Sequence, residues 1–321
     1  MDEPLLIPDD KRFVVLPVVY QDLYEMYKKA VSCFWTSEEV DLSRDLNDWA
    51  SMSPEQKHFI SLVLAFFACM DGLINENICL RFMGEVQNSE ARLFYGFQMA
   101  IEGIHQETYA NLIDTYIREP AERTKLFNAI ENFPCVKKKA DWVKKHINSE
   151  RSFAERLVAF ICVEGIHFSG AFCAIYYFRT KNLLAGLCFS NELISRDEAL
   201  HTEFGIALYR KLKHKLSPQS VHSIIKEAVE IETEFICEAL PCRLIGMNSA
   251  LMTQYIQFVA DRVCLQLGVD KIWGSSNPFS FMETISIQRK SNFFECRVSE
   301  YALATKTGKE NDLIFEMDSD F

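Results

Sequence analysis

The tetrapeptide Glu-Gly-Ile-His occurs twice in this chain, at residues 102–105 and 164–167, each time within a long apolar segment. A Glu and a His three positions apart share one face of a helix, which is how a helical bundle presents two ligands to a metal ion. Only 12 Gly and 9 Pro occur in 321 residues, so long stretches lack residues that interrupt helices. These features predict a helical bundle rather than a fold built from strands.

Start and stop signals divide the chain into long helices. Ser53-Pro54-Glu55-Gln56 combines an N-cap, a first-turn proline and a capping-box partner, so a helix is expected from there to about residue 83. Similar signals predict helices over residues 88–118, 148–179, 183–213, from 217 onward, 243–267 and 281–301. Because no Ser/Gly-rich linker separates them, we expect one domain over residues 1–301, followed by a polar, acidic tail over 302–321.

Charge and cysteine usage narrow the class of protein. The formal net charge is −11, and no basic block stands out beyond Lys137–Lys139, so no nucleic-acid partner is expected. The 11 Cys form no Cys-x-x-Cys pair and the acidic start shows no signal peptide, which favours free thiols and a cytoplasmic location. Residues 157–178 are long enough to span a membrane, but Glu164 and His167 at mid-span favour a buried core helix.

Glu-x-x-His occurs four times, beginning at Glu55, Glu102, Glu164 and Glu198. Glu55 lies in the first turn of a capped helix, where its charge complements the helix dipole, so His58 is not expected to be a ligand. A dinuclear carboxylate site needs one carboxylate from each of two helices and Glu-x-x-His from each of the other two. Asp71 precedes Glu102 by 31 residues and Glu164 precedes Glu198 by 34, which gives this pattern twice. The predicted metal ligands are Asp71, Glu102, His105, Glu164, Glu198 and His201.

A single buried Asp or His is usually a hydrogen-bonded structural group, but four carboxylates on apolar helices require a compensating cation. Carboxylates with one His per metal suit iron or manganese, and such sites are compatible with O₂ activation. Tyr109 follows His105 by four residues and extends the same helix face by one turn. From its position, Tyr109 is either a buried hydrogen-bonding group or an oxidisable one.

Five stretches carry a resemblance to a known family: residues 32–43 (SCFWTSEEVDLS), 70–77 (MDGLINEN), 101–109 (IEGIHQETY), 163–170 (VEGIHFSG) and 194–201 (ISRDEALH). In order and spacing the chain resembles the small subunit of class I ribonucleotide reductase, in its eukaryotic and large-DNA-virus (poxvirus-like) form. The resemblance runs from about residue 10 to Phe321. It implies an all-α, ferritin-like bundle with a dinuclear metal site and additional flanking helices.

The resemblance also implies roles for individual residues. Asp71, Glu102 and His105 would bind one iron and Glu164, Glu198 and His201 the other, giving two iron ions per chain, with manganese as an alternative. Tyr109 would carry a stable tyrosyl radical. Trp35 and Asp197 would join His105 in the route by which the radical equivalent leaves, and Tyr301 would continue it. The tail ending at Phe321 would dock on the large subunit, and the chain would form a homodimer.

The implied function is radical generation for the reduction of ribonucleoside diphosphates to deoxyribonucleotides, the precursors of DNA. The chain has no P-loop and no Gly-x-Gly-x-x-Gly, so nucleotide binding would fall to the separate large subunit. The alternatives are ferritin-like iron storage and a di-iron oxygenase or desaturase. Storage requires neither Tyr109, nor the Trp35–Asp197 pair, nor a docking tail.

Two positions depart from the family pattern. His167 stands where the family usually has an aromatic residue. Its imidazole is expected to hydrogen-bond Glu164, to compete for metal, or simply to pack, and it would make the site less apolar. The amino terminus lacks the longer extension of cellular eukaryotic members, which makes the chain look more like a viral version.

Overall fold

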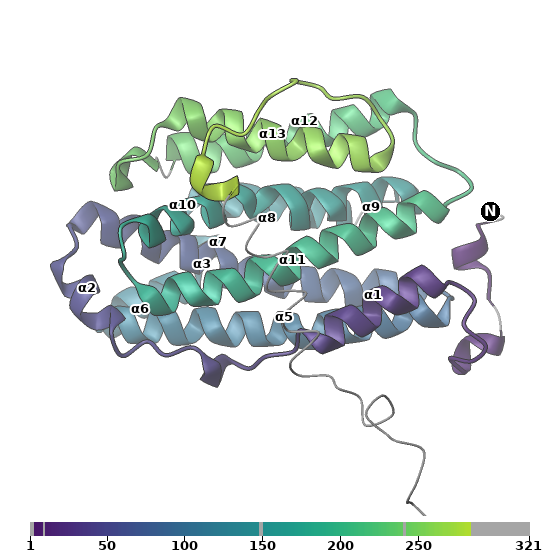
Figure 1. The fold of residues 1–321 in the computed structure, drawn as a ribbon, viewed down its shortest axis with the longest axis horizontal. Helices are drawn as coiled ribbons and strands as arrows, with labels where there is room; N and C mark the ends of the chain where they lie inside the picture. Colours follow the sequence, from purple (N-terminus) through teal and green to yellow (C-terminus); the bar gives the residue numbers. More distant parts are fainter. Residues whose placement is uncertain (1–2, 9, 148–149, 240–241, 284–321) are drawn as a thin grey trace, which may run out of the picture. The chain divides into compact units, whose positions relative to one another are not determined.

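The computed structural model describes residues 3–8, 10–147, 150–239 and 242–283, and within these ranges every regular element is a helix (Figure 1). The expected all-α class is confirmed. The α-helices are α1 (Gln21–Ser32), α2 (Asp45–Ser51), α3 (Pro54–Asn77), α4 (Met83–Glu85), α5 (Ser89–Tyr116), α6 (Pro120–Phe127), α7 (Ala129–Asn132), α8 (Pro134–Ile147), α9 (Phe153–Cys162), α10 (Ser169–Thr180), α11 (Ala185–Lys211), α12 (Pro218–Thr233) and α13 (Ser249–Leu267). Short 3₁₀ and π segments join some of them: η1 (Pro4–Leu6), η2 (Asp10–Phe13), η3 (Ser37–Glu39), η4 (Ile78–Phe82), η5 (Val163–His167), η6 (Glu234–Ala239) and η7 (Cys242–Ile245).

The long helices pack as two neighbouring pairs. α3 packs along α5, and α11 packs along α9 and α10, while α1 covers the outer side of α5 (Figure 1). α12 and α13 lie beside each other over α9 and α10 (Figure 1). The interior between the pairs includes many fully buried aromatic rings, among them Phe66, Phe67 and Phe168, and also encloses a group of buried polar and charged side chains.

Capping explains where several helices begin. The Ser53 hydroxyl accepts from the Gln56 N–H and the Gln56 side chain accepts from the Ser53 N–H, which is the predicted capping box of α3. The expected helix start near residue 148 is wrong. Ser152 and Glu155 form a capping box that starts α9 at Phe153.

Other boundaries also differ from the prediction. The helix expected over residues 243–267 begins only at Ser249, because Gly246 has a φ of +90° and Asn248 caps the amides of Ala250 and Leu251. Helices α1, α2 and α6 to α8 were not predicted individually. Most of the helix expected over 281–301, and the predicted domain boundary at 301, lie outside the described residues, so both stay predictions.

Two continuous helical stretches, Pro54–Glu85 and Phe153–Thr180, are long and apolar enough to cross a membrane. In the structure 72% and 94% of their most apolar windows are buried against other helices. Their apolar surface therefore packs within the bundle, as a helix that is apolar all round does in a protein core.

Asp45 fixes the start of α11, the helix that carries three of the predicted site residues. Its carboxylate accepts the N–H groups of Gly186 and Leu187, both at 2.8 Å, and the Tyr116 hydroxyl at 2.6 Å. A Cβ on Gly186 would lie 2.6 Å from the Asp41 carbonyl oxygen, so only glycine permits this approach. The N-terminus of α11 is thus anchored to a segment from the other end of the domain's sequence.

Candidate metal centre

The six predicted ligands meet in the middle of the bundle. Asp71 comes from α3, Glu102 and His105 from α5, Glu164 from η5, and Glu198 and His201 from α11. Each of the six side chains is at most 2% exposed. They form two overlapping groups in which the ligand atoms lie within 4.8 Å of one another, Asp71/Glu102/His105 and Glu102/Glu164/Glu198/His201.

Glu102 and Glu198 each lie between the two histidines. The Glu102 carboxylate places Oε2 3.3 Å from His105 Nδ1 and Oε1 3.1 Å from His201 Nδ1. The Glu198 carboxylate places Oε1 3.1 Å from His105 Nδ1 and Oε2 3.4 Å from His201 Nδ1. Both carboxylates therefore have one oxygen on each side, the geometry of ligands that bridge two cations.

Asp71 and Glu164 lie at the two outer sides of this cluster. Asp71 Oδ2 is 4.0 Å from His105 Nδ1, and Glu164 Oε2 is 3.9 Å from His201 Nδ1. Neither oxygen of Asp71, nor Oε2 of Glu164, has a hydrogen-bond partner among the described residues. Buried oxygens without partners that converge on one space are a suitable donor set for a hard or intermediate cation such as iron or manganese.

The electrostatics of the cluster also call for positive charge. Burial, reinforced by the charge of Glu102, raises the pKa of Asp71 well above its usual range, and burial with the charge of Glu198 does the same for the pKa of Glu164. Burial opposes charge on His201, but the carboxylates of Glu102 and Glu198 raise its pKa to about 9. Protons and metal cations therefore compete for the same buried oxygens.

Gln98 belongs to this site although its role was not predicted. It is fully buried on α5, one turn before Glu102, and its Nε2 donates to Glu164 Oε1 at 2.9 Å and to Glu102 Oε1 at 3.4 Å. The amide thereby ties carboxylates from two different helices together. The sequence does contain a signal for this role, because Gln98 lies four residues before Glu102 and therefore on the same face of the helix.

Trp35 and Asp197 form a buried hydrogen-bonded chain that ends at His105 of the cluster. The Trp35 indole Nε1 donates to Asp197 Oδ2 at 2.7 Å, and the same oxygen lies 3.3 Å from His105 Nε2. The indole and imidazole rings are stacked with centroids 5.9 Å apart. Arg196 binds the other oxygen of Asp197. Its Nη2 donates to Asp197 Oδ1 at 3.3 Å and to the Cys33 carbonyl at 2.8 Å.

Tyr109 lies in an aromatic pocket beside the cluster. Its ring centroid is 4.9 Å from that of Phe67, which in turn packs against Phe168 and Phe172. The phenol is 2% exposed, and its hydroxyl has no hydrogen-bond partner among the described residues. Burial raises the pKa of Tyr109 well above its usual range, and Asp71 contributes most among the charges. Of the two alternatives for this residue, a hydrogen-bonding role is not what the structure shows.

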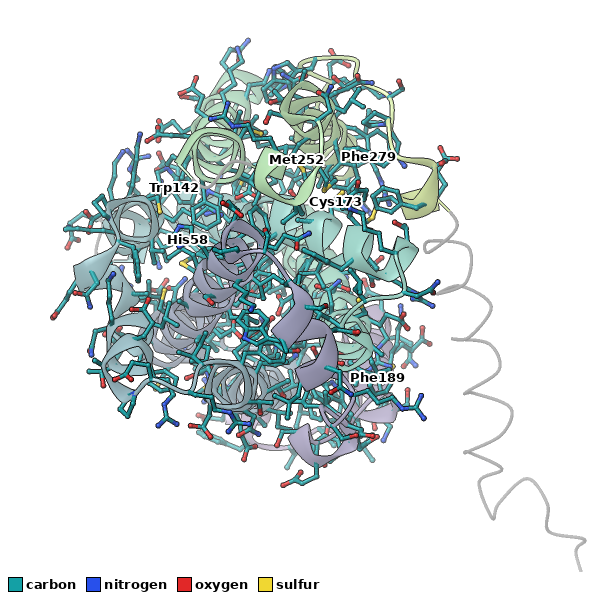
Figure 2. All side chains as sticks on the ribbon, turned by 90° about the vertical axis from the view of Figure 1, so that its left-hand side faces the viewer. His58, Trp142, Cys173, Phe189, Met252 and Phe279 are labelled. Carbon is teal, nitrogen blue, oxygen red and sulfur yellow. The ribbon has the colours of Figure 1, made fainter. Side chains whose placement is uncertain are left out.

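His167 does not enter the metal cluster. Its ring packs edge-on against Trp142, with centroids 4.8 Å apart. Trp142 (labelled in Figure 2) lies on α8, and its Nε1 donates to Glu227 Oε2 of α12 at 3.2 Å. Burial lowers the pKa of His167 well below its usual range, so the ring is neutral. Of the three expected outcomes, hydrogen bonding to Glu164 and competition for metal are wrong, and packing is correct. The pocket around Tyr109 stays apolar.

The first Glu-x-x-His also lies elsewhere. His58 lies near the start of α3 (Figure 2) and lines a surface pocket of about 320 Å³ with Trp49 and Tyr116. Tyr301 and Phe321 lie outside the described residues.

A helical bundle with a carboxylate–histidine cluster shared by two helix pairs is the architecture of the ferritin-like dinuclear-metal proteins. Within that class, residues 12–278 match the family model described as "Ribonucleotide reductase, small chain". The chain therefore belongs to the ribonucleotide reductase small-chain family, and the recognition made from its motifs is confirmed.

Curated relatives are similar over nearly their whole length. The chain is 57% identical to the ribonucleoside-diphosphate reductase small subunit of Dictyostelium discoideum, covering 95% of this chain and 90% of the relative. It is 54% identical to the corresponding protein of vaccinia virus (strain Ankara), covering 99% and 100%. Among solved structures, the ribonucleotide reductase Rnr4 homodimer of Saccharomyces cerevisiae matches with a TM-score of 0.82 and 36% identity, covering 91% of this chain and 93% of that one.

Proposed function

We propose that this chain generates and stores a tyrosyl radical on Tyr109 for a ribonucleoside-diphosphate reductase. The observation that carries the proposal is the position of Tyr109. It is a buried phenol, enclosed by Phe67 and its neighbours beside the carboxylate–histidine cluster, and its hydroxyl has no partner in the described part of the chain. Two iron ions bound there would supply the O₂-dependent oxidising power that removes an electron from the phenol. Among the carboxylates near the phenol, Asp71 is the one whose charge acts most strongly on it.

In this proposal the six clustered residues would hold the metals, and manganese is the alternative to iron. Trp35, Asp197 and His105 form the inner end of the radical route. Their hydrogen bonds support this role, because a continuous chain of hydrogen bonds joins the His105 imidazole through Asp197 to Trp35, in the segment between α1 and α2. Tyr301 would continue the route.

We further propose the assembly around this site. Residues 1–301 would form the metal-binding domain of a cytoplasmic homodimer, and the tail 302–321 ending at Phe321 would dock on the large subunit. The large subunit would bind and reduce the ribonucleoside diphosphates. Its identity, viral or cellular, does not alter the chemistry assigned to Tyr109.

Electron paramagnetic resonance tests the proposal. The metal-free protein is loaded anaerobically with Fe²⁺, exposed to O₂, and compared with Tyr109→Phe and Tyr95→Phe. Tyr95 is a matched control because it is also buried, with a hydroxyl that has no partner among the residues described. We expect a tyrosyl signal in the wild type and in Tyr95→Phe and none in Tyr109→Phe. No signal in any of the three, with two irons bound per chain, would contradict the radical role and favour iron storage or oxygenase chemistry.

A further inference from the structure

The helix that leads to Glu164 is interrupted at Val163, so Glu164 lies within the interruption. α9 passes into the π-helix η5, and α10 starts at Ser169 after Phe168. A π-turn inserts an extra residue, so backbone groups around it lose their ordinary i→i−4 partners. Glu164 is the second residue of the turn, and the direction of its carboxylate depends on how the interruption is held.

A buried ion pair holds both sides of this interruption. Lys139 on α8 donates from Nζ to the His167 carbonyl at 2.7 Å, and Glu232 on α12 accepts the Gly170 N–H through Oε1 at 2.9 Å. Lys139 Nζ also pairs with Glu232 Oε2. The Lys139 ammonium thus faces the carbonyl end of the π-turn, and the Glu232 carboxylate faces the amide end of α10. Each charge has the sign that the helix dipole favours at that end.

The surroundings are shaped to hold this pair. Both side chains are 0% exposed, and Lys139 Nζ lies 3.8 Å and 4.1 Å from the ring centroids of Phe66 and Phe235. A Cβ on Gly170 would lie 2.6 Å from Glu232 Oε1, so glycine is what lets the carboxylate reach the backbone. A buried ion pair generally stabilises a fold no more than apolar side chains of similar volume would. Stability alone therefore does not explain why Lys139 and Glu232 contact the backbone at His167 and Gly170.

The π-turn also packs closely against α11, the helix that carries Glu198 and His201. A Cβ on Gly165 would lie 2.9 Å from Cγ2 of Thr202, the neighbour of His201. Because the turn and α11 are packed this closely, a small displacement of the turn changes the separation of Glu164 and His201, which is 3.9 Å between Oε2 and Nδ1.

We propose that Lys139 and Glu232 are positioning residues that hold the π-turn and thereby direct the Glu164 carboxylate towards the metal beside His201. The inference rests on the proposed metal centre. Helices α8 and α12 supply no metal ligand, but through Lys139 and Glu232 they would raise the metal affinity of that centre.

The test is a Mn²⁺ titration of the metal-free, full-length protein, with free Mn²⁺ counted by electron paramagnetic resonance. The main variant is Lys139→Met/Glu232→Gln, which leaves no unpaired charge, keeps an acceptor for Gly170, and removes the donor to the His167 carbonyl. We expect the wild type to bind two Mn²⁺ per chain. In the variant one Mn²⁺ should bind as before and the other at least tenfold more weakly, the range seen when groups that orient metal ligands are removed.

The matched control is Lys138→Met/Glu234→Gln, an ion pair one and two residues away on the same side of the bundle, whose side chains are 52% and 42% exposed. It should leave both affinities unchanged. Hydrogen exchange of residues 163–172 gives a second readout and should speed up only in the main variant. A purely structural ion pair would lower the unfolding temperature without separating the two Mn²⁺ affinities.

Gly170→Ala approaches the same contact from the other side, because the added methyl group displaces Glu232, and it should give the same selective loss. Two unchanged Mn²⁺ affinities in the folded double variant would overturn the inference. Failure of both the double variant and Gly170→Ala to fold would overturn it too, since the pair would then be a requirement of the fold. A wild type that binds no Mn²⁺ would instead contradict the proposed metal centre itself.

Discussion

Trp35 donates its indole N–H to Asp197 Oδ2 at 2.7 Å, although the two residues are 162 positions apart in the sequence. Both are buried, and the accepting oxygen also lies 3.3 Å from His105 Nε2. The contact joins the segment after α1 to α11 and to the metal-side imidazole. Asp197 Oδ2 therefore links the segment after α1 to the His105 imidazole of the cluster.

Replacing this donor should separate radical transfer from metal binding. Trp35→Phe keeps a buried aromatic ring but removes the indole donor to Asp197 Oδ2, which costs about 1.5–3 kcal/mol of stability for a hydrogen bond to a charged group. We expect two metals per chain and a Tyr109 radical, with most of the nucleotide reduction in the presence of the large subunit lost. Trp49→Phe is the control, since Trp49 stacks on Tyr116 away from the cluster. Equal turnover in the two variants would contradict the route.

Gln98→Leu should weaken the metal centre without unfolding the bundle. Leucine fills a similar volume but cannot donate to Glu164 Oε1 or Glu102 Oε1, so both carboxylates gain rotational freedom. We expect metal affinity to fall about 10- to 100-fold, measured by Mn²⁺ titration. Gln106→Leu, on the same helix but with a half-buried side chain outside the cluster, should bind metal normally. Normal affinity in Gln98→Leu would show that Gln98 has no positioning role.

The buried histidines beside Trp142 predict a pH dependence of stability. Burial lowers the pKa of His167 well below its usual range and lowers that of His146 to about 4. Between the unfolded pKa of about 6.5 and the lower folded values, the unfolded chain binds more protons than the folded one. Stability is therefore fully present above about pH 6.5 and falls as the pH decreases, by up to about 1.4 kcal/mol per pH unit for each histidine.

His167→Phe should remove one of these two contributions. Urea unfolding of the metal-free protein between about pH 5 and 6.5 should show a slope lower than in the wild type, with the difference approaching about 1.4 kcal/mol per pH unit at the acidic end. The variant should still bind two metals, because His167 packs on Trp142 and not on the cluster. A slope unchanged from wild type, or a lost metal, would be inconsistent with the neutral ring packed away from the cluster.

Asp45→Ala should loosen α11 as a whole. The substitution leaves the Tyr116 hydroxyl and the amides of Gly186 and Leu187 without their acceptor, which should lower the free energy of unfolding by about 3 kcal/mol or more. Asp41→Ala, whose exposed carboxylate only caps Ser43, should cost less than about 1 kcal/mol. Similar unfolding midpoints for the two variants would argue against the anchoring role.

That these six residues meet was predictable, because Glu-x-x-His repeats on apolar helices are rare and burying unpaired carboxylates is unfavourable. His167 was harder to place for a geometric reason. The rule that i and i+3 share a helix face assumes α-helical winding, whereas residues 163–167 form a π-turn, which rotates less per residue and carries His167 away from Glu164. Local sequence shows no signal for that turn. For Gln98 the sequence offered only its position four residues before Glu102, because its contact with Glu164 on another helix appears only in the folded chain.

The anchoring of α11 by Asp45 has a consequence for biosynthesis. Asp45 can accept the Gly186 amide only after 141 further residues have been synthesised, and His201 follows His105 by 96 positions. The six-residue cluster therefore cannot assemble on a chain that stops short of α11. A ribosome needs roughly 5–20 seconds to add the 96 residues between His105 and His201. During that interval α3 and α5 expose apolar faces and lack the partners that complete the ligand set. Any cation held by all six residues can therefore bind only after synthesis has passed α11, which ends at Lys211 of the 321 residues.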